Sequence, residues 1–336
     1  MARRARHSWP AWGFLGVLAA AAAWYALSGA DAAAIDRACI GGCAPGTSGH
    51  GLGTDSLGRD VWLQLAGGAA TALLGGVAAA LGSLLVGLGL GIGAAWASRR
   101  GEQLSWTVLA AAALWCGYCA YVLRYAERTV PAASVLALAS VALAWGLLGV
   151  QRRARATSSM WHTGVRPDRL LLWVSEVVSS VPALLLLLAL ASLALRPGLG
   201  QLVLVYVAVR WAAFAVLALQ ETRAALGQPY VRAAYATGIG AWPLLWKHVG
   251  PNVFPPLLVK GLLAVGGFIL VEGTFAFLGL GLPATQPSWG RVLAEAQQVR
   301  GGWWLWVFPG VALLGSILSL QVLARGVERR KSLEVS

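Results

Sequence analysis

The feature that most constrains this chain is a series of long apolar segments with few or no charged residues. About 20 residues of α-helix cross a hydrocarbon core of about 30 Å. Eight such segments can be counted, at 11–28, 67–97, 104–123, 132–150, 170–195, 202–220, 256–271 and 303–323. The composition agrees, because 58% of the residues are hydrophobic and only 12% are charged, against about 25% charged in soluble domains. The sequence therefore predicts an all-α, polytopic membrane helix bundle with about eight transmembrane helices.

The basic residues between these segments are unevenly distributed. If the amino terminus is cytoplasmic, the cytoplasmic connections hold seventeen Arg and Lys residues and the opposite connections hold seven. The positive-inside rule then places both termini in the cytoplasm. The net charge of +13 indicates membrane lipids as the anionic partner, and no nucleic acid is expected. An alternative is that the first segment is a cleaved signal peptide, because Ala30, Asp31 and Ala32 resemble a cleavage site.

Two basic residues fall within predicted spans. Lys260 is expected near the start of its span, from which its side chain can reach the membrane interface, whereas Arg210 lies deeper. A charged residue at the bilayer centre costs about 2.5 to 3.5 kcal/mol on insertion scales. Arg210 is therefore expected to face the protein interior.

Residues 53–60 have the two glycines of a phosphate-binding loop at the right separation. Such a loop needs a Lys and a hydroxyl where this chain has Arg59 and Asp60, so no nucleotide site is predicted. The structural alternative is an ordered turn, in which Asp55 closes an Asx turn and Asp60 caps a helix that begins at Val61.

Four glycines alternate along the second apolar segment, at Gly87, Gly89, Gly91 and Gly93. They form two small-residue pairs four residues apart, which allow another helix to approach closely within a membrane. The pattern predicts helix packing and no dinucleotide site, because no βαβ unit is present.

The four cysteines fall into two pairs. Cys39 and Cys43 lie in the predicted outer loop, where oxidising conditions permit a local disulfide; the sequence leaves its formation open. Cys116 and Cys119 have the spacing of a redox motif, but they lie in an apolar segment, where small buried residues are the simpler interpretation. The four histidines are far apart in the sequence, so no metal site is predicted.

A long polar stretch, residues 221–256, separates two of the spans. Pro229 can begin a short helix, and Gly238 supplies the left-handed residue that ends it. A second short helix is predicted to start near Trp242 and to stop before Pro251, which has no amide hydrogen. The first helix carries small residues on one face, which suits either close approach by a partner protein or contact with lipid headgroups.

Residues in this stretch resemble the cytoplasmic coupling motif of a known family, the second (C-type) permease subunit of dipeptide, oligopeptide and nickel ABC importers. The residues that carry the resemblance are Tyr230, Val231, Arg232, Ala233, Ala234, Gly238, His248, Val249, Gly250, Pro251 and Asn252. The family ordinarily has Glu in place of Arg232 and Leu in place of Gly250. The alanine pair, the spaced glycine and the following proline are all present.

Three further segments resemble signatures of the same family, in the same order. The outer-loop signature comprises His50, Gly53, Thr54, Asp55, Gly58, Arg59 and Asp60. Pro182 corresponds to the proline of the family's third span. The last signature comprises Glu272, Phe277, Leu278, Gly279, Leu280, Gly281, Pro287, Ser288, Trp289 and Gly290.

The resemblance covers about residues 8–100 and 164–330, and family members usually have six spans. It implies three parts: an N-terminal span with an extracytoplasmic loop (1–66), a permease core (67–100 and 164–330) with a coupling loop at 221–255, and an inserted helical pair (101–163). Because the insertion adds an even number of helices, the orientation of everything downstream is kept.

The resemblance also implies a function, that of a type I ABC importer permease in the bacterial cytoplasmic (inner) membrane. Such a chain is a pore subunit without catalytic residues, metal or cofactor, since ATP and magnesium are bound by partner subunits. The implied partners are a second homologous permease, two cytoplasmic ATP-binding subunits and an extracytoplasmic solute-binding protein. Peptides are the default substrate, and related permeases carry nickel, sugars or other solutes.

Two other classes of protein stay open at this point. A stand-alone secondary transporter would usually have internal repeats and ion ligands near the midplane, and no repeat is visible in the sequence. A membrane-embedded enzyme would need converging catalytic groups, for which Glu176 and Glu272 are the main candidates, and neither has an obvious catalytic partner in the sequence.

Overall fold

The computed structural model describes residues 9–99 except Ser48, residues 166–180, Pro182 and Leu185, and residues 198–335 except Gly281, Ala284 and Arg300. The predicted spans at 104–123 and 132–150, the second cysteine pair and the inserted pair of helices at 101–163 lie outside these residues. The domain boundaries stay predictions.

The described elements are helices of different lengths. In chain order they are α2 (Trp9–Ser28), the 3-10 helix η1 (Arg37–Cys39), α3 (Val61–Arg99), α6 (Pro167–Ser180), α8 (Leu199–Gly227), α9 (Pro229–Ala236), α10 (Ala241–Leu244), the π-helix η2 (Leu245–Val249), α11 (Gly250–Phe277), α12 (Trp289–Glu295) and α13 (Trp304–Val335). The described residues form no strand beyond isolated bridges such as that of Ile35 with Arg59. The predicted all-α class is confirmed.

Five of these helical segments are long and apolar enough to cross a membrane. They are α2, α3, α8, the continuous segment that contains α11, and α13. They correspond to five of the eight predicted spans, and α6 covers the beginning of a sixth, at 170–195. The total of eight stays a prediction, because the remaining segments lie outside the described residues.

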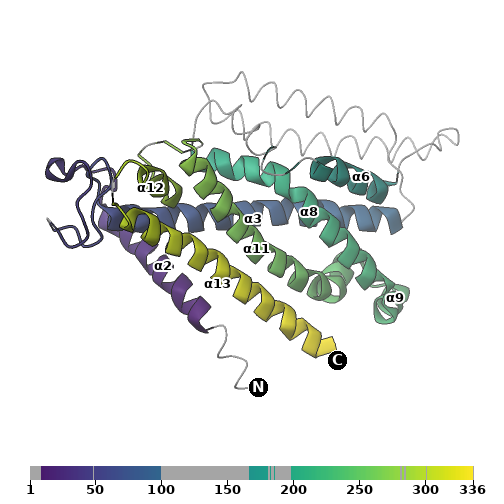
Figure 1. Cartoon of the computed structure of the whole chain (residues 1–336). Helices are drawn as coiled ribbons and strands as arrows, with labels where there is room; N and C mark the ends of the chain where they lie inside the picture. The colour runs from purple at the N-terminus through teal and green to yellow at the C-terminus, as the bar shows by residue number, and fades with distance from the viewer. Residues whose placement is uncertain are drawn as a thin grey trace.

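The longest helix, α3, lies at the centre of the bundle (Figure 1). Its 39 residues span about 58 Å at about 1.5 Å per residue. It packs against α2, α8 and α11, and α11 in turn packs against α12 and α13. Residues 29–60 and α12 lie at one end of the bundle, which we call the loop end; α9 and the carboxyl end of α3 lie at the opposite end, the α9 end (Figure 1).

Small residues bring α3 and α8 into close contact. A Cβ at Gly87 would lie 2.4 Å from the Phe214 Cβ, and one at Gly91 would lie 2.5 Å from the Ala215 carbonyl oxygen. This confirms the predicted packing for one glycine pair. No described atom lies within 4 Å of a Cβ at Gly89 or Gly93, so the second pair faces no described helix.

The prediction that the second short helix stops before Pro251 is wrong. Helices α10, η2 and α11 follow one another without a break. The Gly250 N–H donates to the Leu245 carbonyl oxygen, and this wider π-turn shifts the hydrogen-bonding register just before the proline. The Asn252 side chain donates to the His248 carbonyl oxygen at 2.9 Å, which satisfies one carbonyl of the altered turn. In the structure α8 continues to Gly227 and α11 begins at Gly250; the bounds of the coupling loop, 221–255, stay a prediction.

Of the two basic residues within the spans, Lys260 lies in surroundings that differ from the prediction, and Arg210 lies in surroundings that agree with it. Because α11 begins at Gly250, Lys260 is not near the start of its helix; its Nζ lies 6.0 Å from the centre of the Phe214 ring. Arg210 is half-buried, and its Cζ lies 6.0 Å from the centre of the Tyr206 ring. The Arg210 position agrees with the expectation that it faces the protein interior.

Candidate functional site

The predicted coupling residues gather around α9, which is a helix of eight residues. Pro229 occupies its first turn, where the missing N–H has no helical partner to lose. The helix ends at Ala236, and Gly238, just beyond it, has a φ of 80° and donates its N–H to the Tyr235 carbonyl oxygen at 3.1 Å. A left-handed residue after the last turn is the expected glycine C-cap. The predicted start and end of this helix are confirmed.

One side chain of α9 is fixed in the core of the bundle. Val231 is fully buried and belongs to a cluster that includes Leu226, Leu244, Val249 and Val253. These four residues come from α8, α10, η2 and α11. The packing of Val231 therefore joins α9 to the helices that precede and follow it.

Three predicted coupling residues form a polar contact beside this core. The Tyr230 hydroxyl donates to the His248 carbonyl oxygen at 3.3 Å and accepts a hydrogen bond from Asn252 Nδ2 at 2.7 Å. The Tyr230 and His248 rings lie 6.3 Å apart between centroids. Pro251, in the first turn of α11, lies between His248 and Asn252 in the chain. The structure thus brings together residues that are up to 22 positions apart.

The outer side of α9 is available for contact. Arg232 and Ala233 are exposed, whereas Ala234 is half-buried and packs against the core cluster. The alanine pair is thus divided between an exposed and a packed position. Trp242 and Trp246 are 69% and 64% exposed, and their rings stack edge to face at 5.6 Å. Exposed Trp at the end of a spanning helix is typical of the membrane interface.

At the loop end, two aspartates organise the turn that leads into α3. Asp55 Oδ1 accepts the backbone N–H groups of Leu57 and Arg59, each at 2.9 Å. Asp60 Oδ1 accepts the N–H of Leu63 at 3.2 Å. The predicted Asx turn and the predicted cap of the helix that begins at Val61 are both confirmed.

A buried ion-pair network joins this turn to α12. Arg59 Nε donates to Asp55 Oδ2 at 2.7 Å, and Arg59 Nη2 donates to Glu295 Oε1. Gln64 also donates to Asp55. Burial raises the pKa of Glu295 to about 7, and the nearby Asp55 carboxyl adds to the rise. Sequence reasoning missed Glu295, because it lies 236 positions from Arg59 and no local pattern links the two.

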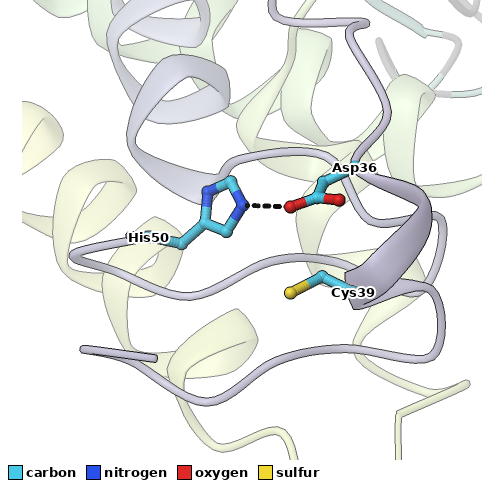
Figure 2. Close-up of side chains that lie close together, drawn as sticks. All are labelled: Asp36, Cys39 and His50. Atoms are coloured by element: carbon cyan, nitrogen blue, oxygen red, sulfur yellow. Dashed lines mark hydrogen bonds and ion pairs between the residues drawn. The ribbon is translucent and has the colours of Figure 1, made fainter. Parts of the chain in front are cut away.

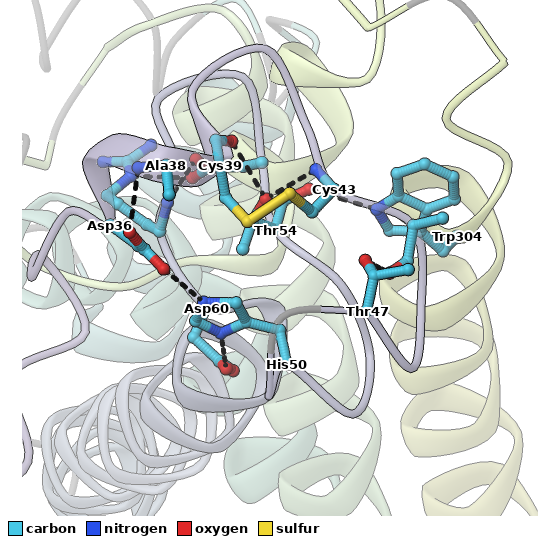
Figure 3. Close-up of a disulfide and its surroundings, with 12 residues drawn as sticks. Asp36, Ala38, Cys39, Cys43, Thr47, His50, Thr54, Asp60 and Trp304 are labelled. Atoms are coloured by element: carbon cyan, nitrogen blue, oxygen red, sulfur yellow. Dashed lines mark hydrogen bonds and ion pairs between the residues drawn. A yellow bond between two sulfur atoms is a disulfide. The ribbon is translucent and has the colours of Figure 1, made fainter.

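His50 lies between two carboxylates of the same loop (Figure 3). Its Nδ1 is 2.7 Å from Asp60 Oδ2, and its Nε2 is 3.2 Å from Asp36 Oδ2. The hydrogen bonds to Asp60 and Asp36 raise the pKa of His50. The pKa of Asp36 is lowered by the Ala38 N–H and by His50. Two acceptors on opposite ring nitrogens favour the doubly protonated imidazolium, which has a donor on each nitrogen.

Asp36, Cys39 and His50 lie within 4.8 Å of one another through their potential ligand atoms (Figure 2). Cys39, however, forms a disulfide with Cys43, with the two Cα atoms 5.2 Å apart (Figure 3). Its thiolate is then unavailable, so the group does not fit a metal site. The disulfide that the sequence left open is formed in this structure.

The outer-loop signature also contacts α13. The Trp304 Nε1 donates to the Thr54 carbonyl oxygen at 3.1 Å, and Thr54 Oγ1 accepts the Cys43 N–H at 2.8 Å. Gly53 and Gly58 form the turns on either side of Asp55, with φ of 80° and 83°. The signature residues at this end therefore build a folded cap over the bundle, and their roles in the structure are packing and hydrogen bonding.

The last signature fixes α12 on α11. A Cβ at Gly290 would lie 1.9 Å from the Gly273 carbonyl oxygen, so only glycine fits at this crossing. Trp289 is fully buried and donates its Nε1 hydrogen to the Leu65 carbonyl oxygen at 2.9 Å. Glu272, next to Gly273, is 1% exposed.

The first residues after α11, on the way to α12, form its carboxyl-terminal cap. The Leu280 N–H donates to the Phe275 carbonyl oxygen at 2.7 Å, and Gly279 has a φ of 73°. This is the Schellman type of helix end. Phe277 and Leu278 are 37% and 53% exposed. Gly281 lies outside the described residues.

The helices define a multi-pass membrane protein with a short, partly exposed helix at one end and a cross-linked loop at the other. The chain belongs to the family of binding-protein-dependent transport system inner membrane components, whose profile matches residues 157–333. The predicted resemblance to this family is confirmed. Transport components of this kind are permeases.

Several curated relatives are similar to this chain. The "Probable D,D-dipeptide transport system permease protein DdpC" of Escherichia coli K12 is 32% identical over 165 residues, which are 49% of this chain and 55% of the relative. The "Di/tripeptide transport system permease protein DppC" of Pseudomonas aeruginosa is 31% identical over 168 residues, 49% of this chain and 55% of the relative. The "Dipeptide transport system permease protein DppC" of Escherichia coli K12 is 28% identical over 155 residues, 46% and 51% of the two chains. The chain thus spans about half of the length of the curated relatives it matches.

Proposed function

We propose that this chain is the transmembrane permease subunit of an ATP-driven importer that moves peptides from a binding protein into the cytoplasm. The family supports transport across an inner membrane, and the names of the three relatives support dipeptides and short peptides as the substrate class. The chain would hydrolyse nothing itself and would bind no cofactor, since ATP and magnesium would be held by separate subunits.

The observation that carries this proposal is the construction of α9. Val231 and the contact of Tyr230 with Asn252 join the helix to α11, while Arg232 and Ala233 stay exposed. A short helix that is attached to the spans on one side and exposed on the other can receive a partner and pass its displacement on to the attached spans. Coupling of this kind is mechanical and needs no catalytic side chain.

The proposed assembly places α9 in the cytoplasm together with both chain termini. Two ATP-binding subunits would contact α9 and its counterpart on a second, homologous permease. The solute-binding protein would deliver peptide at the loop end, on the extracytoplasmic side of a bacterial inner membrane. A disulfide at the loop end supports this orientation, because disulfides persist in oxidising compartments.

Crosslinking from Ala233 tests the proposed contact directly. A photoreactive residue at Ala233 is expected to capture an ATP-binding polypeptide in working cells, because Ala233 is exposed on α9. The same group at Gly261 serves as a control; no described atom lies within 4 Å of a Cβ there, and it lies on the spanning helix α11. Capture of lipid alone from Ala233 would contradict the proposal.

Substitution of Gly238 tests whether the geometry of α9 matters for transport. Gly238→Val places a β-branched residue at a φ of 80°, which costs on the order of 1 to 2 kcal/mol. We expect assembled complexes of this variant to hydrolyse ATP with reduced peptide uptake. Gly240→Ala is the matched control, because its Cβ would meet only Pro243 Cδ, at 3.6 Å. Normal uptake by an assembled Gly238→Val complex would show that the docking geometry is wrong.

A further inference from the structure

A pocket of about 340 Å³ opens at the α9 end, between the ends of α3, α6, α8 and α9. Four arginines line it, each from a different part of the chain: Arg99, Arg166, Arg223 and Arg232. We call this site the arginine pocket. Apart from the arginines, its lining consists of small or apolar residues such as Ser98 and Gly227.

Among the described residues that line it, the arginine pocket carries positive charge only. The part of the lining that the structure describes contains no acidic side chain. Asp168, buried beside it in the first turn of α6, accepts hydrogen bonds at Oδ2 from Arg166, at 3.1 Å, and from Arg223. Counting the described lining residues and Asp168, four positive charges face one negative charge, an excess of three. Asp168 itself is not one of the residues that line the pocket.

The remaining two arginines connect the pocket to α9. The Arg99 Cζ lies 4.8 Å from the centre of the Tyr235 ring, in a cation–π contact between α3 and α9. Arg232 projects from α9 itself and is exposed. Arg232 adds to the positive charge of the lining.

The arginine pocket lies at the ends of two long apolar helices. Two of the helices that are long and apolar enough to cross a membrane, α3 and α8, end at its rim, at Arg99 and Gly227. Trp173, on the adjoining helix α6, is 63% exposed. Exposed Trp and clustered basic residues at the ends of spanning helices mark the level of the lipid headgroups.

We propose that the arginine pocket binds a phosphate-bearing anion at the α9 end of the bundle. Guanidinium groups match the oxygens of a phosphate through paired N–H donors, and several of them can share one tetrahedral anion. The phosphate can come from the headgroup of an anionic phospholipid or from soluble phosphate, and the position at the ends of α3 and α8 favours the lipid. A bound anion would hold α9 against α3 and α6. This site does not depend on the proposed transport function.

Binding can be measured on the purified full chain in a neutral detergent by native mass spectrometry. Short-chain phosphatidylglycerol is titrated against the wild type, with phosphatidylcholine of the same chain length as the zwitterionic comparison. We expect one phosphatidylglycerol to be retained at concentrations at which phosphatidylcholine is not. Arg99→Gln or Arg232→Gln should each weaken retention about fivefold, because each basic residue near an anionic surface contributes on that scale. The double variant should weaken it about twentyfold.

The control variant is Arg169→Gln, which removes an exposed arginine of α6 that does not line the pocket. It should retain phosphatidylglycerol within about twofold of the wild type. Arg99→Lys keeps the charge and should lose less than Arg99→Gln. Size-exclusion profiles and unfolding temperatures identify any variant that fails to fold. If Arg99→Gln fails to fold, the lipid retention of Arg99→Lys tests the role of Arg99 in its place.

Competition with inorganic phosphate distinguishes the two sources of the anion. Displacement of the lipid by millimolar phosphate would assign the pocket to phosphate itself, and lipid binding that resists phosphate would assign it to the headgroup. Equal retention of both lipids without phosphate binding would overturn the proposal, as would pocket variants that bind like Arg169→Gln. A photoreactive group at Ser98 that captures a polypeptide and no lipid in native membranes would overturn it in favour of a protein partner.

Discussion

The two ends of the bundle are stabilised in different ways. At the loop end, residues 29–60 are held by a disulfide, a buried ion-pair network and hydrogen bonds to α12 and α13. At the α9 end, α9 is held by one buried side chain, one polar contact and a cation–π contact with Arg99. The loop end is thus joined to distant parts of the chain, whereas α9 is joined mainly to its neighbours in sequence.

This difference indicates which end of the bundle can open locally at a small cost in free energy. Local opening requires little free energy where a segment has few buried contacts and exposed hydrogen bonds. The α9 end meets that description and the loop end does not. The predictions below test this contrast, from the largest expected effect on stability to the smallest.

The largest effect is expected at the crossing of α11 and α12. Gly290→Ala would place a Cβ 1.9 Å from the Gly273 carbonyl oxygen, and since the obstacle is backbone we expect a loss of about 3 kcal/mol in the free energy of unfolding. Thermal unfolding in detergent measures it. Gly89→Ala is the matched control, because no described atom lies within 4 Å of its Cβ; it should be neutral or stabilising by up to about 1 kcal/mol. Equal unfolding temperatures for the two variants would contradict the conclusion that the loop end is rigidly packed.

The disulfide should have the next largest effect. Replacement of both Cys39 and Cys43 by Ser opens a cross-link between residues four positions apart, which for so short a loop contributes about 2 kcal/mol in the chain-entropy model. Amide hydrogen exchange in residues 29–60 should accelerate, and exchange in α9 should not change. Wild type treated with a reductant should behave like the variant. Unchanged exchange in the loop would mean that the other contacts suffice to hold it.

The stability of the loop end should depend on pH through His50. The pKa of His50 is raised above its ordinary value of 6.5, so its contribution is complete below about 6.5 and is lost as pH rises through the raised pKa. The lowered pKa of Asp36 gives a contribution that is complete above 3.8 and is lost as pH falls. The effect should be smaller than that of the disulfide, because solvent screens ion pairs at the surface.

The measurement is the difference in loop hydrogen exchange between wild type and His50→Asn across pH 5 to 8. Glu295 also has a raised pKa, so its contribution to stability is lost as pH rises from 4.5 to about 7. Subtracting the variant curve from the wild-type curve removes this contribution, because both proteins contain Glu295. We expect wild type to lose protection as pH rises and the variant to lose less. Parallel curves for the two proteins would contradict the assigned charge of His50.

The smallest effect is expected at α9. Tyr230→Phe removes the hydroxyl that contacts His248 and Asn252. Because Tyr230 is 49% exposed, the loss should be about 0.5 kcal/mol and should appear as faster hydrogen exchange in α9 alone. Tyr235→Phe is the control, on the same helix and 50% exposed. If Tyr230→Phe destabilised the whole bundle, α9 would be as firmly integrated as the loop end and the contrast would fail.

Local features of the sequence predicted much of this fold. The apolar segments located the five described spans because a bilayer fixes their length. Pro229 and Gly238 gave both ends of α9, and Asp60 gave the start of α3, because each acts through backbone groups within a few residues. At these positions the physical cause and its effect are neighbours in the chain.

Features that depend on distant residues could not be predicted in this way. The helix continues past Pro251 because a π-turn and the Asn252 side chain accommodate it, and neither is a local propensity. The pairing of Arg59 with Glu295 joins residues 236 positions apart. The arginine pocket draws its residues from four separate segments. Only the folded chain reveals such groups.

The contact of Gly290 with Gly273 has a mechanical consequence. Two backbones that touch without side chains between them leave no compressible layer, so α11 cannot tilt at that crossing without carrying α12 along. Helix α12 ends at Glu295, which holds Arg59 of the loop. A displacement of α11 at this crossing would therefore be passed through α12 to Arg59 and the turn that begins α3.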